Sequence, residues 1–237
     1  NTGTVLKGIT TARQNYSNNT SGVEYGFQIE ATNATKSSLS LIRSSNDAND
    51  GGIFIGKTRS TSVGGNTTVQ AGDDLGTITF GGADGTSLLF GAEITAEVQS
   101  GVGNDDMPTD LIFKTNGGST TTPERLRIAS DGQITQTAAS GDTILTLKRS
   151  DTNTTGTVGA INFAASDDHS VASIQARGDG DNEGAHLQFY TTTAAAGDMY
   201  NAASVERLRI TSNGNVNIGT GNLNQTDRML NVYGGRM

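Results

Sequence analysis

The sequence has no cysteine and no tryptophan among its 237 residues, only two prolines, and 5% aromatic residues. Without cysteine, the chain can form neither disulfides nor thiolate metal sites. Leu, Ile, Val and Phe together make up about a fifth of the residues, close to the level at which folded chains give way to disordered ones. One copy can therefore build only a thin hydrophobic core, and the composition favours burial of apolar surface against other chains.

Basic residues are also scarce. Lys and Arg number 16 against 24 Asp and Glu, which gives a net charge of −8. An acidic chain is a poor partner for the phosphates of nucleic acid. No apolar run approaches the roughly 18 residues that a membrane-spanning helix needs. We therefore expect neither a nucleic-acid partner nor insertion into a membrane.

What the sequence does contain is a repeated phrase. Glu-Arg-Leu-Arg-Ile at 124–128 returns unchanged at 206–210, and each copy is followed by Ser-(Asp/Asn)-Gly. Such self-similarity is best considered before any other pattern. The recurring residues are Glu124, Arg125, Leu126, Arg127, Ile128 and Gly132 in the first copy, and Glu206, Arg207, Leu208, Arg209, Ile210 and Gly214 in the second.

Each copy of the phrase predicts a β-hairpin. The aliphatic residues alternate with arginines, which is the period of a strand with the arginines on the opposite face. A three-residue loop pairs Ile128 with Ile134 and Ile210 with Val216, whereas a two-residue loop would place Ile134 on the wrong face. The favoured register is the one that keeps the apolar residues of both strands on the same face. We therefore predict the three-residue loop, with its glycine in the left-handed region.

Other strand-like segments recur in the same order along the chain, and no convincing helical stretch is present. The matched segments are Leu39–Ser44 with Leu145–Ser150, Leu75–Phe80 with Val158–Phe163, Ala92–Ala96 with Ala172–Ala176, and Leu111–Thr115 with Leu187–Thr191. The predicted fold class is all-β, with tandem β-repeat units.

The repeats divide the chain into four parts. Val23–Glu30 predicts one or two strands in the N-terminal part, and Met229–Tyr233 resembles the opening strand of a unit. The predicted parts are a connecting β segment at 1–37, a first unit at 38–136 with an inserted hairpin at about 50–72, a second unit at 137–220, and the start of a third at 221–237.

The closing phrase at 206–219, Glu-Arg-Leu-Arg-Ile-x-Ser-x-Gly-x-Val-x-Ile-Gly, resembles one that recurs in bacteriophage tail fibres, especially the long fibres of marine and cyanobacterial phages. The resemblance covers most of residues 38–220. The first copy departs from the pattern after Gln133, where Ile-Thr-Gln replaces Val-x-Ile-Gly. The motif is a structural hairpin, so it marks a fibre rather than a receptor-binding site.

The resemblance implies that the repeat units form an elongated fibre, a parallel homotrimer, with an N-terminal attachment to other virion tail or baseplate proteins. It also implies a distal tip that contacts a host receptor, with a glycan as the expected class, and a virion-borne, extracellular location. Many such proteins end in a self-cleaving intramolecular chaperone, and nothing in this chain matches one.

Several groups could carry chemistry, but each has a plainer explanation. Asp179–Gly184 imitates the start of a calcium loop, yet its twelfth position is Tyr190 rather than an acid, so we interpret it as a solvated turn. The acidic pairs could serve glycoside cleavage, but adjacent strand residues point apart and no aromatic cluster accompanies them. These pairs are Asp73-Asp74, Asp105-Asp106 and Asp167-Asp168.

His169 and His186 are the two histidines. They could gather at a threefold axis to bind metal, but a solvent-exposed role is favoured for each, and two such histidines make no Ser-His-Asp arrangement. The arginines of the repeated phrase could bind acidic glycans. The favoured alternative is pairing with Asp and Glu of neighbouring strands or subunits, with a role in register and solubility. We therefore expect no catalytic residues, no metal and no cofactor.

The leading hypothesis is a structural shaft segment of a phage tail fibre involved in host attachment, without enzymatic activity. The alternatives are a bacterial surface adhesin or filament repeat and a polysaccharide-degrading tail spike. The repeats are expected to act mainly as a spacer, because their loops hold few aromatic residues of the kind found in binding hot spots.

Overall fold

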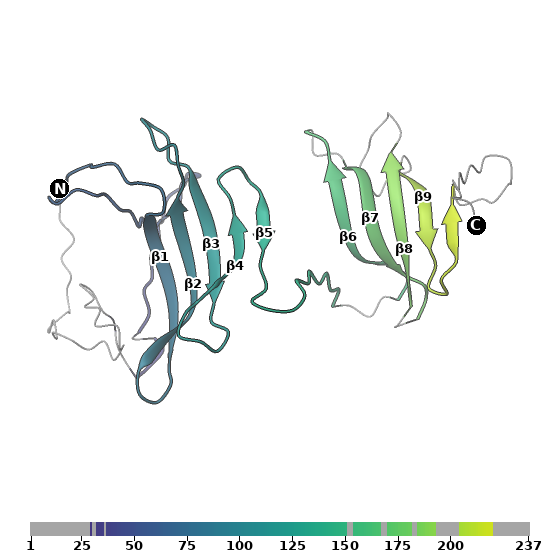
Figure 1. The fold of residues 1–237 in the computed structure, drawn as a ribbon, viewed down its shortest axis with the longest axis horizontal. Coiled ribbons are helices and arrows are strands. Elements are labelled where there is room, and N and C mark those ends of the chain that lie inside the picture. Colours follow the sequence, from purple (N-terminus) through teal and green to yellow (C-terminus); the bar gives the residue numbers. More distant parts are fainter. Residues whose placement is uncertain are drawn as a thin grey trace, which may run out of the picture. The chain divides into compact units, whose positions relative to one another are not determined.

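The computed structural model describes residues 29, 32–35, 37–150, 154–166, 170–181, 184–192 and 204–219. The chain divides into two compact units, Asn1–Thr143 and Ile144–Met237. Every regular element in the described ranges is a β-strand, so the all-β prediction is confirmed (Figure 1). No helix in this part of the chain has the length and hydropathy to span a membrane.

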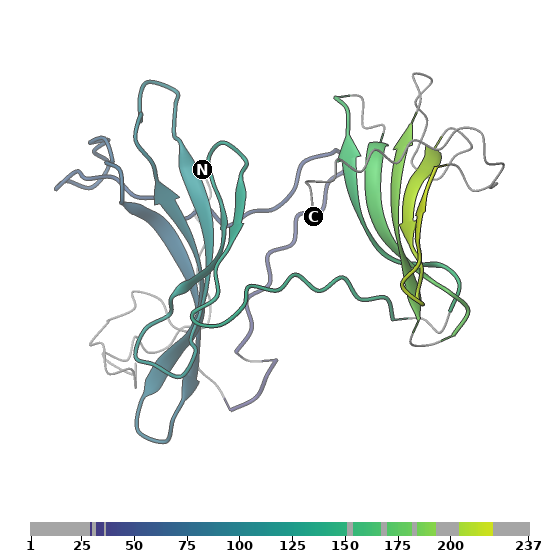
Figure 2. The same ribbon diagram turned by 45° about the vertical axis from the view of Figure 1, so that its right-hand side comes forward.

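Each unit is one five-stranded antiparallel sheet in which consecutive strands are neighbours. The strands of the first sheet are β1 (Asp74–Ala83), β2 (Leu88–Val98), β3 (Thr109–Thr115), β4 (Glu124–Ile128) and β5 (Ile134–Gln136). Those of the second are β6 (Thr157–Ala164), β7 (Ser170–Gly178), β8 (Ala185–Thr192), β9 (Ser204–Ile210) and β10 (Val216–Ile218). The β1–β2 hairpin extends past the ends of β3 and β4 (Figure 2).

The closing hairpins have the predicted register. Ile128 pairs with Ile134, and Ile210 pairs with Val216. In the first hairpin, Gly132 N donates to Ala129 O over 2.8 Å, closing the turn. Gly132 and Gly214 have φ of 86° and 87°, in the left-handed region that glycine adopts without steric cost. The repeated Ser-(Asp/Asn)-Gly is thus a three-residue loop in both copies.

The expected opening strands are not formed. Leu39–Ser44 and Leu145–Ser150 have no strand assignment, and Ile42 is 84% exposed. Alternation alone is insufficient, because a strand also needs a neighbour for its backbone N–H and C=O groups. Residues 50–72, expected to form an inserted hairpin, are a loop in which Arg59 N donates to Thr67 O over 3.1 Å.

Some predictions fall on residues that the structure does not describe. They are the strands expected at Val23–Glu30, apart from Ile29, and at Met229–Tyr233, together with Asp167, Asp168 and His169.

The two faces of each sheet have opposite character, and the buried side is the polar one. In the first sheet, this side holds Thr95 and Asp110, 1% and 5% exposed, together with the aliphatic Ile112, which pairs with Thr95. In the second sheet, Gln175 pairs with Gln188, which is fully buried. Large aliphatic side chains lie on the other face, where Ile78 is 50% exposed and Ile161 48% exposed. A single chain therefore leaves much of its apolar surface uncovered.

Candidate functional site: the polar face of each sheet

The repeated phrase contains a β-bulge. Phe113 of β3 pairs with Leu126 of β4, but the next residue, Lys114, pairs with Glu124, so two residues of β4 lie opposite one step of β3. The second sheet has the same register shift, where Phe189 pairs with Leu208 and Tyr190 with Glu206. A bulge changes which face the following side chains occupy.

The bulge corrects the prediction that both arginines of a phrase share one face. Glu124 and Arg127 meet although they are three positions apart, with 2.6 Å between Glu124 Oε2 and Arg127 Nη2. Arg125 instead donates from Nε to Thr115 Oγ1 over 3.2 Å. In the second sheet, Arg207 donates to Thr191 Oγ1 over 2.9 Å. Strict alternation cannot anticipate this split, because it follows from the register with the preceding strand.

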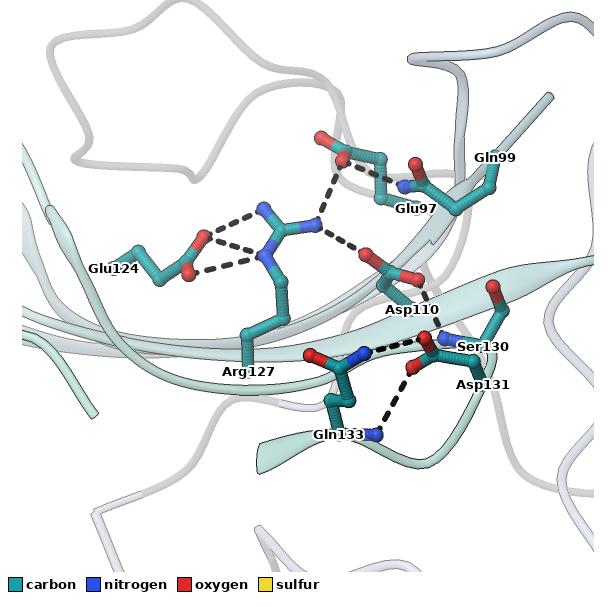
Figure 3. A network of polar contacts seen from close by, with 8 residues as sticks. All are labelled: Glu97, Gln99, Asp110, Glu124, Arg127, Ser130, Asp131 and Gln133. Carbon is teal, nitrogen blue, oxygen red and sulfur yellow. Dashed lines mark hydrogen bonds and ion pairs between the residues drawn. The ribbon is translucent and has the colours of Figure 1, made fainter. Parts of the chain in front are cut away.

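Arg127 is the centre of a polar network on the first sheet (Figure 3). Its Nη1 lies 2.6 Å from Asp110 Oδ2 and 3.1 Å from Glu97 Oε1. Its Nε donates to both carboxylate oxygens of Glu124, over 3.0 and 3.1 Å. The three acids come from β2, β3 and β4, so one guanidinium links three adjacent strands.

The network extends into the hairpin loop. Asp110 is 5% exposed, and its Oδ1 accepts a hydrogen bond from Ser130 N over 2.8 Å. Within the loop, Asp131 Oδ1 accepts from Gln133 N over 3.0 Å. Asp110 therefore connects the arginine to the turn, and both of its carboxylate oxygens have donors.

The contacts between Arg127 and its carboxylate partners stabilise the charged form of both Arg127 and Glu124. The Arg127 guanidinium lowers the pKa of the Glu124 carboxyl. In turn, the hydrogen bonds that Arg127 donates, first to Glu124 and then to Asp110, raise the pKa of Arg127. A general acid for glycoside cleavage needs a raised carboxyl pKa, and Glu124 shifts the opposite way. The arrangement joins charged side chains of three adjacent strands.

The second sheet has a reduced version of the network. Arg209 Nη2 lies 2.6 Å from Glu206 Oε2, which also accepts from Gln188 Nε2 over 2.7 Å. Burial is the main cause of a raised pKa at Tyr190, whose hydroxyl lies 3.3 Å from the same oxygen. Of the described side-chain atoms, Ser173 Oγ and Gln188 Oε1 are buried without a hydrogen-bond partner. This network contains one carboxylate where the first contains three.

His186 occupies the place that Asp110 holds in the first sheet. Its Nδ1 accepts from Ser212 N over 3.2 Å, as Asp110 Oδ1 accepts from Ser130 N. The histidine is half-buried rather than fully solvent-exposed. Both sheets thus anchor the loop of the closing hairpin through a side chain from the third strand of the unit.

Asp73 holds the loop before β1. This buried carboxylate accepts from Arg59 Nε over 2.6 Å and from Lys57 Nζ over 2.8 Å. It also accepts from Gln70 N over 2.9 Å. The hydrogen bonds from Arg59 and then Lys57 hold the pKa of Asp73 well below its usual range. One member of this predicted acidic pair is therefore a structural anchor.

The described residues of the calcium-like segment, Asp179–Asp181 and Gly184, bond to one another. Gly184 N donates to Asp181 Oδ1 over 2.6 Å, and Asp181 N donates to Asp179 Oδ1 over 3.3 Å. No cluster of three or more acidic, His or Cys side chains suited to a metal occurs within the described ranges. Asp105 has φ of 56°, and Asp106 forms a bridge with Gly103 in the β2–β3 connection.

The comparisons with known proteins give no family. No protein-family model matches the sequence, and no curated protein matches it. Among solved structures, the chain is similar to the carboxy-terminal domain of the bacteriophage T5 L-shaped tail fibre, with a TM-score of 0.37 and 9% identity, over 84% of this chain and 98% of that one. It is also similar to that domain with its intramolecular chaperone domain, with a TM-score of 0.35 and 12% identity, over 84% and 67% of the two chains. Likeness at this level carries no argument about function.

Proposed function

We propose that the chain is a structural shaft segment of a bacteriophage tail fibre, located on the virion and involved in host attachment. The observation that carries the proposal is a sheet that occurs twice, with the same strand order and the same face left uncovered. Repeated units that cannot cover their own apolar surface are typical of fibrous and solenoid proteins. The resemblance of the repeated hairpin to tail-fibre phrases supports the same function.

The proposed partners follow from this function. Two further copies complete the hydrophobic core in a parallel homotrimer. Other virion tail or baseplate proteins hold the fibre, and other parts of the fibre contact a glycan receptor on the host. The polar face supports a structural role, since the side chains of Arg127 and Arg209 are engaged with carboxylates of their own sheet. We propose no catalytic activity for these sheets.

Antibodies raised against the chain test the location. Gold-labelled antibody applied to particles and to bacterial cells from the same sample is expected to decorate fibres on the particles. Labelling of cell surfaces instead would favour the surface adhesin or filament. Turnover of host capsular polysaccharide by the purified chain would favour the tail spike.

Deletion of the second unit, residues 137–219, tests the spacer role. The shortened fibre should remain trimeric and still adsorb to the host, because contact is made by other parts of the fibre. Loss of adsorption by a folded, trimeric deletion variant would place the receptor site within the repeats.

A further inference from the structure

The apolar faces of the two sheets share one central row. In the first sheet, the row consists of directly paired residues on four adjacent strands, and the second sheet has the same residue types in the same order. The rows are Ile78, Ile94, Phe113 and Leu126 in the first sheet, and Ile161, Ile174, Phe189 and Leu208 in the second. Each row crosses the strands, so its members repeat at the strand spacing of about 4.8 Å.

The chain covers neither row completely. Ile78 and Ile161 are about half exposed, at the edge strands of their sheets. Next to the central rows, Phe80 is 55% exposed and Phe163 50% exposed. Contiguous apolar surface of this kind marks an interaction site.

The charges of the two faces favour another copy of the same chain as the occupant. The polar face of the first sheet carries Glu97, Asp110 and Glu124 around one arginine, so two such faces in contact would bring like charges together. The central rows themselves contain no charged residue. The arginines beside them, Arg125 and Arg207, each donate to a threonine of their own sheet, Thr115 and Thr191. The two rows are alike, so one mode of association suits both sheets.

The sizes of the side chains fit three sheets around an axis. On β2, Ile94 lies between Ala92 and Ala96, and on β7, Ile174 lies between Ala172 and Ala176. When three sheets, one from each chain, form the sides of a triangular cross-section, the middle of each sheet is nearest the axis. Neighbouring sheets converge towards the corners of the triangle. On β2 and β7, the large residue at mid-strand with a small one on either side matches that taper.

The dimensions agree with such a triangle. If each side of the triangle is a sheet whose strands are about seven residues long, the side measures about 23 Å. The midpoint of the side then lies about 6.6 Å from the axis. This distance is comparable with half of the roughly 10 Å spacing between packed sheets. Side chains at mid-strand can therefore meet at the centre without leaving a channel.

We propose that each central row lies on a threefold axis, where every residue of the row meets its own counterparts in two other copies. The proposal rests on the proposed function, since it assigns the surface through which the shaft trimer forms. It predicts that Phe113 and Phe189 each form an aromatic layer contributed by three chains.

Single cysteines test the row, because the natural chain has no cysteine. In a rotationally symmetric assembly, a residue lies next to its own copies only near the axis. The test variants are Ile94→Cys and, independently in the second sheet, Ile174→Cys. The matched controls are Ala96→Cys, on the same strand and face but off the row, and Thr79→Cys, on the polar face.

Each variant is first shown to be trimeric by light scattering and is then treated with a short bismaleimide. Cα atoms at the row are expected about 11 Å apart between copies, within reach of such a reagent when side chains point inward. Crosslinked dimer should approach about two thirds of the chains for Ile94→Cys and Ile174→Cys, because one link joins two of three symmetric copies. Ala96→Cys should give clearly less, and Thr79→Cys none.

The outcomes separate this inference from the function on which it rests. A trimer that crosslinks at Thr79 or Ala96 but not at Ile94 or Ile174 overturns the axial row and leaves the shaft function standing. Crosslinking of all chains at Ile94 indicates a twofold contact and also overturns the threefold row. If the unmodified chain is a stable monomer, both the row and the proposed trimer are wrong.

Discussion

Replacing Arg127 with methionine is expected to destabilise the protein by about 2–3 kcal/mol. The guanidinium side chain is 25% exposed, and its partner Asp110 is 7% exposed at the side chain. Removing one member of a fully buried pair costs about 3–5 kcal/mol, whereas exposed pairs contribute about 0–1 kcal/mol. The network lies between these limits, and the variant leaves three carboxylates without their common cation.

Arg209→Met is the matched control in the second sheet. Arg209 pairs with one carboxylate, Glu206, which keeps Gln188 and Tyr190 as hydrogen-bond donors. We therefore expect a loss of about 1 kcal/mol, towards the exposed limit. Urea unfolding followed by circular dichroism at one protein concentration measures both variants, with similar slopes required for the comparison. Equal losses within about 0.5 kcal/mol would refute the claim that the three-carboxylate network matters.

A second substitution separates charge from packing. In Arg127→Met combined with Asp110→Asn, the amide oxygen can still accept from Ser130 N, but the buried charge is gone. The double variant should recover about 1 kcal/mol relative to Arg127→Met, because neighbouring sites are not additive. If the second substitution only adds to the loss, Asp110 acts through its loop contact rather than through its charge.

The same network predicts the acid response. Arg127 lowers the pKa of Glu124 in the folded state, so this carboxylate stabilises the fold above its ordinary pKa of about 4.3. That stability is lost as the pH falls through the lowered, folded-state pKa. In Arg127→Met the pKa returns towards its ordinary value, and loss of structure should begin at a higher pH. Identical acid midpoints for the two proteins would contradict this sign.

Three further changes have defined outcomes. Gly132→Val and Gly214→Val should each lower the melting temperature, since a β-branched residue tolerates positive φ poorly; unchanged melting would show the loops to be wrongly assigned. Gly159→Ala should cost about 1–3 kcal/mol, because a Cβ there would lie 2.8 Å from Leu147 Cβ, whereas Gly82→Ala has open space and should change stability by less than about 0.5 kcal/mol. Chelator should leave the melting temperature unchanged, and a large drop would reveal a structural metal.

The closing hairpins could be predicted because their register depends on nearby residues. Ile128 and Ile134 must share a face, and only the three-residue loop allows this with glycine at positive φ. The all-β class likewise follows from short alternating segments, since period two is visible within each segment alone.

The polar network could not be predicted, because it depends on how separate strands align. Glu97, Asp110 and Arg127 come from three strands, and nothing in the sequence around any one of them specifies the other two. The bulge that brings Glu124 to Arg127 is set by the pairing of β3 with β4. The recurrence of Glu three positions before Arg in both phrases was the available signal.

The prediction of strands at the opening segments was wrong for a related reason. Apolar and polar residues alternate in Leu39–Ser44 as in a strand. This alternation indicates that one face needs burial, but it does not specify a neighbouring strand that would pair with the backbone. In the second unit, the opening segment meets the sheet through Leu147, which lies against Gly159, and in the first unit Ile55 lies against Gly76. The counterpart of Leu147 is therefore Ile55, within the residues expected to form an insertion.

The mass of the chain in solution tests the central claim most directly. Each sheet buries much of its polar face and leaves much of its apolar face uncovered, so the core is expected to be completed by other copies. Sedimentation equilibrium across a range of concentrations should give the mass of three chains of 24.5 kDa each, with cooperative unfolding that depends on concentration. A folded species of one chain, with a melting temperature independent of concentration, would contradict the account.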